Sequence, residues 1–290
     1  MTTEAKPSAV HIAKNCTLPW VEKYRPATLS EVVAHEEILE TTQRLMDSGN
    51  MPHLLFYGPP GTGKTTTIKA SAHYLYGKER IRANVLEMNA SDDRGIDVVR
   101  NQIREFASTS SVFFNSASKT SAMSSFKLVI LDEADQMSSD AQAALRRIIE
   151  KYTRNVRFCI VCNHINKIIP ALQSRCTRFR FAPVKKAAML PRLAFIAQEE
   201  SIPFTNDGLV AAFRLSNGDM RRCLNTLQAS AMSTGEITEE SVYRTTGNPT
   251  PADVRGLVEE MLSSDYATSW NRVLRAVTEK GMSSTDLVRE

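Results

Sequence analysis

The sequence lacks the marks of a membrane or secreted protein. Its 290 residues contain no run of 18 apolar residues, so no membrane-spanning segment is expected. Residues 1–17 lack the apolar core of a signal peptide and are expected to form a flexible tail. Apolar residues make up 42% of the chain and charged residues 23%, which is typical of a globular protein.

Cysteine is scarce, with five in the whole chain, which argues against a disulfide framework. Cys159 and Cys162 have the Cys-x-x-Cys spacing of redox and zinc sites. However, they lie inside the apolar run 156–162, and no second pair or nearby histidine cluster completes a metal site. We therefore predict that both belong to a buried strand.

Acidic residues are absent from residues 151–198, a stretch that holds ten lysines and arginines. A segment of one charge sign suits a polyanion, either the backbone of a nucleic acid or the triphosphate bound by another molecule. The alternative for most of these residues taken singly is a solvated basic surface.

A glycine-rich loop lies between an apolar run, 54–57, and a segment of helical character, 65–76. In this setting Gly-x-x-x-x-Gly-Lys-Thr forms a phosphate cradle, because backbone N–H groups and the helix N-terminus point at the phosphates. Lys64 is expected to reach the β- and γ-phosphates of a nucleoside triphosphate, and the Thr65 hydroxyl to hold Mg²⁺. The nucleotide-binding residues predicted here are Gly58, Pro59, Pro60, Gly61, Thr62, Gly63, Lys64, Thr65 and Thr66.

Polar residues follow two further apolar runs. Asp132 and Glu133 end the run 126–131, where Asp132 is expected to organise Mg²⁺ and Glu133 to polarise the attacking water. Asn163 directly follows 156–162 and is expected to hydrogen-bond the γ-phosphate or that water. Asp-Glu-Ala-Asp also occurs in helicases of the DEAD-box kind, but no second motor domain follows.

The order of elements predicts an α/β fold. Apolar β-like runs alternate with helical patterns over residues 18–183, which indicates a parallel sheet with helices on both faces. After Pro183 only helical patterns remain, so residues 184–245 are expected to form a small helical lid. Within it, Arg221 begins a helix from which it is expected to reach the phosphates. Two more helical patterns start a third unit over 246–290.

Together these elements resemble the Walker A, Walker B, sensor 1 and sensor 2 motifs of an AAA+ ATPase. Three strings narrow the resemblance to the small subunits of eukaryotic replication factor C, a clamp loader, and it covers residues 18–290. These strings are Trp-Val-Glu-Lys-Tyr-Arg-Pro at 20–26, Asn-Ala-Ser-Asp-Asp-Arg-Gly at 89–95 and Ser-Arg-Cys at 174–176. Such subunits end in a helical collar, of which residues 246–290 supply only the beginning.

The resemblance implies a nuclear hetero-pentamer of replication factor C subunits that opens the sliding clamp PCNA and loads it onto primer-template DNA. It implies that Arg175 acts in trans on ATP held by the neighbouring subunit. Arg146 or Arg147 is expected to couple neighbouring sites. The resemblance also implies that Val21, Tyr24 and Arg25 help to enclose the nucleotide base.

Contacts to DNA and to the clamp are expected on one helix and the loop after it. Arg100 and Arg104 lie along the helix that starts near residue 95, with Arg94 just before it, and similar helices in clamp loaders follow duplex phosphates. The alternative is a solvated helix face. The clamp contact is expected at Val112, Phe113 and Phe114, apolar residues in a serine-rich loop; the alternative is that they pack onto their own domain.

Two other functions remain open at this stage. The chain could bind ATP without hydrolysing it and serve as a scaffold that donates Arg175, although Glu133 beside an intact P-loop argues against this. It could also be another AAA+ DNA machine, such as a branch-migration motor, although the Ser-Arg-Cys string and residues 20–26 argue against that.

Overall fold

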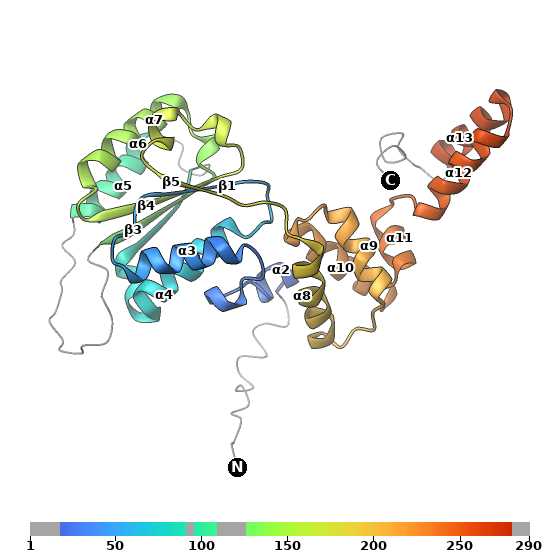
Figure 1. Ribbon diagram of the computed structural model, residues 1–290, viewed down its shortest axis with the longest axis horizontal. Coiled ribbons are helices and arrows are strands. Elements are labelled where there is room, and N and C mark those ends of the chain that lie inside the picture. Colours follow the sequence, from blue (N-terminus) through green and yellow to red (C-terminus); the bar gives the residue numbers. More distant parts are fainter. Residues whose placement is uncertain (1–17, 91–95, 109–125, 280–290) are drawn as a thin grey trace, which may run out of the picture. The chain divides into compact units, whose positions relative to one another are not determined.

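The computed structural model describes residues 18–90, 96–108 and 126–279, and its first layer is a five-stranded parallel sheet. The strands pair in the order β2-β3-β4-β1-β5 (Figure 1). Their bounds are β1 Leu54–Tyr57, β2 Val85–Asn89, β3 Lys127–Asp132, β4 Val156–Cys162 and β5 Thr177–Arg180. The β-like runs of the sequence therefore form one sheet, as predicted.

Helices cover both faces of this sheet, because alternate side chains of each buried strand point to opposite faces. Leu54 and Phe56 pack with α3 and α4, whereas Leu55 packs with α5, α6 and α7 on the other face. The bounds of these helices are α3 Glu36–Asp47, α4 Lys64–Asn84, α5 Ile96–Ser108, α6 Ser139–Tyr152 and α7 Pro170–Gln173. The helix predicted to end at residue 76 breaks at Gly77, where φ is 66°, and then continues.

The two cysteines of the Cys-x-x-Cys pair are buried in β4, as predicted. Cys159 packs in the core cluster with α4, and Cys162 in the cluster with α6, so the two lie on opposite faces. Burial raises the pKa of both thiols, that of Cys162 to about 12. Within the described residues, no three histidine, cysteine or acidic side chains gather to hold a metal.

The helices after β5 are those expected from the sequence, with short helix α2 (Trp20–Lys23) added at the N-terminal side. Threonine side chains cap two of them: Thr205 accepts from Gly208 N and Thr238 from Ser241 N. Their bounds are α8 Lys186–Glu199, α9 Asn206–Ser216, α10 Met220–Thr234, α11 Glu239–Thr246, α12 Pro251–Ser263 and α13 Tyr266–Glu279. None of the helices in the described part of the chain has the length and apolarity to span a bilayer.

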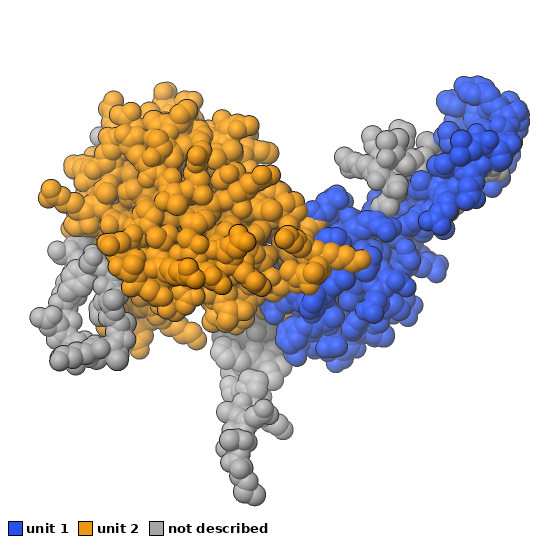
Figure 2. Space-filling model, viewed as in Figure 1, with its two compact units in different colours: residues 1–21, 190–217, 221–290 blue, residues 22–189, 218–220 orange. Residues whose placement is uncertain are grey.

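The chain divides into two compact units (Figure 2). The sheet unit holds Glu22–Met189 with Gly218–Met220, and the helical unit holds Met1–Val21, Leu190–Asn217 and Arg221–Glu290. The domain boundaries expected after residues 183 and 245 stay predictions. In the helical unit, α12 and α13 expose large apolar side chains, among them Leu262, Tyr266 and Trp270.

A buried histidine makes stability depend on pH. His53 is 8% exposed, and its Nδ1 accepts a hydrogen bond from Phe158 N at 3.2 Å. Burial, helped by the charge of Arg157, lowers the pKa of His53 from 6.5 to about 4. The native ring therefore stays neutral while the unfolded ring takes up a proton, so stability is complete above pH 6.5 and falls towards pH 4.

From this shift we expect the free energy of unfolding to fall by about 2 kcal/mol between pH 7.5 and pH 5 on account of His53. Urea unfolding at both pH values measures it, and His53→Gln should remove this part of the pH dependence. The exposed His73 provides the control, since His73→Gln should leave the dependence unchanged. An identical pH dependence in wild type and His53→Gln would contradict the prediction.

Candidate functional site

The loop between β1 and α4 has a backbone that only glycine adopts easily. Gly58 has φ 142°, and a Cβ there would lie 2.0 Å from the carbonyl oxygen of Phe181. Gly61 has φ 65°, and its Cβ would lie 1.7 Å from Asp219 Oδ1. Glycines in such conformations allow a loop to turn its backbone N–H groups towards a bound phosphate, which is how a phosphate cradle works.

Lys64 is the buried cation of this loop, with 6% exposure. Its Nζ donates to the carbonyl oxygens of Gly58 and Pro59, both at 2.8 Å, and to Asn163 Oδ1 at 2.9 Å. An ammonium group has three donors, and the three acceptors named here are neutral oxygens. A buried cation in this loop suits an anionic ligand.

The acidic residues meet the loop from the neighbouring strand end. Thr65 Oγ1 donates to Asp132 Oδ2 at 2.8 Å, and Asp132 Oδ1 accepts from Glu133 N at 2.9 Å. A hydroxyl and a carboxylate in contact are the hard oxygen ligands that Mg²⁺ takes alongside water and phosphate. Glu133 is exposed and has φ 53°, a left-handed conformation that non-glycine residues seldom adopt and that concentrates at functional sites.

The strand order explains why these residues converge. In the sequence, β1, β3 and β4 are separated by helices, but the sheet places them side by side in the order β3-β4-β1. All are parallel, so their carboxyl ends lie at one edge, where α/β sheets bind ligands. Asn163, at the end of the middle strand, thus lies between Lys64 and the acidic pair, as its bond to Lys64 confirms.

Arg175 lies near the amino ends of the parallel strands, at the opposite end of the sheet from the acidic pair and Asn163. It precedes β5, whose first residue, Thr177, is in register with Leu54 at the start of β1. The P-loop follows the other end of β1, after Tyr57, and a strand of this length spans roughly 13 Å. Arg175 is therefore remote from the P-loop of its own chain.

Arg146 and Arg147 have different surroundings, and which of them couples neighbouring sites stays a prediction. Arg146 is half-buried, and its Nε lies 3.4 Å from Glu150 Oε1, the oxygen that also pairs with Arg175 Nη2 at 2.5 Å. Arg147 is exposed and lines a different surface of α6. Arg146, not Arg147, thus belongs to the group around Arg175.

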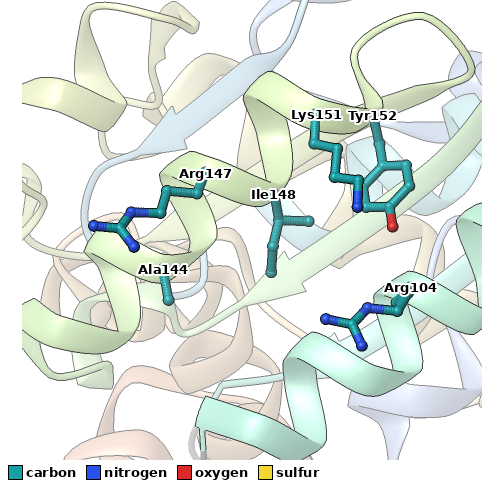
Figure 3. A pocket seen from close by; sticks show the side chains of 6 residues that line it. All are labelled: Arg104, Ala144, Arg147, Ile148, Lys151 and Tyr152. Carbon is teal, nitrogen blue, oxygen red and sulfur yellow. The ribbon is translucent and has the colours of Figure 1, made fainter.

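Arg104 faces a basic pocket between α5 and α6 (Figure 3). The pocket has a volume of about 120 Å³ and combines three cations, Arg104, Arg147 and Lys151, with an apolar floor that includes Ile148. Of the other predicted DNA contacts, Arg94 lies outside the described residues, and the side chain of Arg100 is likewise not described. The predicted clamp contacts Val112, Phe113 and Phe114 also lie outside them.

Gln142 belongs to the site although the motifs did not point to it. It is 2% exposed; its Nε2 donates to Met137 O and Lys167 O, and its Oε1 accepts from Ile169 N at 2.8 Å. It thus joins the segment after the acidic pair to the segment after Asn163. The sequence signal that could have identified Gln142 is its position as a polar residue on the apolar face of α6, one turn before Leu145.

The residues predicted to enclose the base and the arginine predicted to reach the phosphates are divided between the two units. Val21 and Arg221 are in that unit, whereas Tyr24 and Arg25 are in the sheet unit. Arg25 forms an ion pair with Glu22 at 3.1 Å. Within the sheet unit, Met220 N donates to Gly61 O at 3.1 Å, so the P-loop holds the residue that immediately precedes Arg221. Their roles towards the nucleotide stay predictions.

A P-loop, a strand-end acidic pair and a strand-end asparagine on this parallel sheet define an ATPase of the AAA+ class. In agreement, residues 54–184 match the family described as "ATPase family associated with various cellular activities (AAA)". The solved RuvB Holliday junction branch migration motor of Thermotoga maritima is similar in structure, with a TM-score of 0.59 and 12% identity over 89% of this chain and 88% of that one. That likeness shows the fold alone.

Sequence relatives give the particular family. The chain is 50% identical to mouse replication factor C subunit 5 over 99% of its own length and 81% of the relative. It is 52% identical to rice replication factor C subunit 3, over 94% of this chain and 73% of the relative. The fission yeast subunit 3 is 46% identical, over 96% and 78%. This chain belongs to the replication factor C subunit family, of the small-subunit type.

Proposed function

We propose that this chain is an ATP-hydrolysing subunit of a clamp loader, which opens the sliding clamp PCNA and loads it onto primer-template DNA. The observation that carries the proposal is the position of Arg175. The nucleotide site lies at the carboxyl ends of the strands, and this arginine lies near their amino ends. Each copy in a ring would therefore complete the site of a neighbour, which makes hydrolysis responsive to assembly.

Within the site, each residue has a defined task. The P-loop and Lys64 bind the phosphates, and Asn163, already bonded to Lys64, orients the γ-phosphate or the attacking water. Glu133 polarises that water. Thr65 and Asp132 would hold Mg²⁺, which supplies charge neutralisation on the phosphates when bound. Arg221 is proposed to reach the phosphates from the helical unit, and Val21, Tyr24 and Arg25 to enclose the base.

DNA is the polyanion that best suits the basic pocket. Arg104 there joins Arg147 and Lys151, and none of the described residues that line the pocket is acidic. Cations that contact phosphates position a duplex without reading its bases, as a loader of clamps at any primer requires. Arg94 and Arg100 are proposed to continue this contact, and Val112, Phe113 and Phe114 to bind the clamp.

Assembly with other replication factor C subunits into a hetero-pentamer is supported by the family and by α12 and α13. Their exposed side chains include Leu262 at 84% and Tyr266 at 82%, a type of surface that marks protein contacts.

The curated relatives come from mouse, rice and fission yeast. We therefore propose a nuclear location, where eukaryotic DNA is replicated.

The test is ATP hydrolysis by the purified chain, alone and with partner subunits, clamp and primed DNA. We expect low activity alone and strong stimulation in the mixture, lost when this chain carries Lys64→Ala. High activity alone that ignores clamp and primer would overturn the proposal and indicate a self-assembling motor such as a branch-migration enzyme. An unchanged rate in the mixture with Glu133→Gln would overturn hydrolysis by this subunit and favour the scaffold function.

A further inference from the structure

One carboxylate on α6 holds the arginine that is proposed to act in trans. Arg175 Nη2 donates to Glu150 Oε1 at 2.5 Å, and Arg175 Nη1 donates to Ala171 O at 2.6 Å. The guanidinium is thus fixed at both terminal nitrogens, once by α6 and once by the turn of α7. The side chains of Arg175 and Glu150 are 36% and 42% exposed, so both lie at the surface.

We propose that Glu150 is a positioning residue for ATP hydrolysis in the neighbouring subunit, which orients Arg175 before the subunits meet. This inference rests on the trans role of Arg175 proposed above. A free arginine side chain loses rotamer entropy when it docks, and a guanidinium that is already held in place has lost part of that entropy beforehand. Such preorganisation lowers the cost of reaching the transition state.

The hydrogen-bonding capacity of Arg175 allows both contacts at once. A guanidinium carries five N–H donors, and the contacts to Glu150 and Ala171 use two of them. Three donors remain for the oxygens of a phosphate. Glu150 therefore restrains the side chain without occupying its whole donor surface.

The local charge also stays favourable for an anion. Glu150 Oε1 is shared with Arg146 Nε at 3.4 Å, so one carboxylate faces two guanidinium groups. The group of three therefore keeps a net charge of about +1, which can stabilise the negative charge that develops on the phosphate in the transition state. Arg146, one helical turn before Glu150, also keeps the carboxylate paired if Arg175 shifts towards the nucleotide.

Stability is a poor explanation for this arrangement. Ion pairs at such exposure contribute little to stability, because water screens them and long side chains lose conformational freedom. An i,i+4 pair of the opposite order joins Glu40 and Arg44 on α3 at 3.4 Å, with no third partner among the residues that the structure describes. That pair offers a matched control for any effect of Glu–Arg pairing on folding.

The test uses the complex reconstituted with its partner subunits, clamp and primed DNA, with hydrolysis confined to the neighbouring site. Glu133→Gln in this chain, and the matching substitution in the remaining subunits, confine it. Glu150→Gln should then lower kcat at the neighbouring site by about 10-fold and leave KM for ATP unchanged, since only the transition state engages Arg175. Glu40→Gln should change neither.

A double-substitution comparison separates the outcomes. In an Arg175→Ala background, Glu150→Gln should have no further effect, because Glu150 acts through Arg175. An unchanged or raised kcat in Glu150→Gln alone would overturn the positioning role, as would an equal loss in the Arg175→Ala background. If Arg175→Ala itself leaves hydrolysis unchanged, the trans role fails instead, and the inference falls with it.

Discussion

Arg175→Ala is expected to reduce ATP hydrolysis in the assembled complex by about 10³-fold or more at the site that this arginine serves. The reason is electrostatic: an arginine supplied in trans stabilises charge that develops on the phosphate only in the transition state. Arg175 lies at the amino edge of the sheet, remote from its own P-loop. Nucleotide binding by the chain that carries the substitution should therefore stay intact.

The measurement combines single-turnover hydrolysis in the complex with ATP binding by the isolated chain. Arg178→Ala is the control, because this exposed arginine lies three residues along on β5. Loss of ATP binding by the Arg175→Ala chain would show that the arginine serves its own site. Hydrolysis at the wild-type rate would show that the neighbour obtains its arginine elsewhere.

Lys64→Ala should act on the opposite side of the subunit boundary. Removing the buried ammonium takes a donor away from the Asn163 amide oxygen and from the carbonyl oxygens of Gly58 and Pro59, and it removes the charge that faces the phosphates. We expect ATP affinity of the isolated chain to fall by about 100-fold or more, and hydrolysis at its own site to be lost. Fluorescent-nucleotide titration measures the affinity.

Lys69→Ala is the matched control for this result, since Lys69 belongs to the same helix and pairs with Glu87 on β2. Its affinity for ATP should equal that of the wild type. A complex in which Lys64→Ala and Arg175→Ala abolish hydrolysis at the same site would contradict the geometry, because the two residues lie at opposite edges of the sheet. Loss at two different sites is the expected result.

Much of this site could be predicted because its motifs consist of residues that are consecutive in the sequence. A glycine-rich loop, the lysine at its end and the acidic pair after an apolar run depend on local backbone geometry. Their elements appear where the patterns placed them, with β1 at Leu54–Tyr57 and β4 at Val156–Cys162. The relatives support the family that the motifs indicated.

Long-range packing decided the rest. The order β3-β4-β1 brings Asn163 to Lys64, although 99 residues separate them, and the register of β5 with β1 sends Arg175 to the far edge. Partners of Glu150 and Gln142 likewise come from other elements, so these contacts could not be predicted from a local sequence pattern. A motif states which chemistry a segment can perform, because that depends on neighbours in the chain. A functional group lies at one end of the sheet or the other according to how strands distant in the sequence pair, and only the tertiary structure determines this pairing.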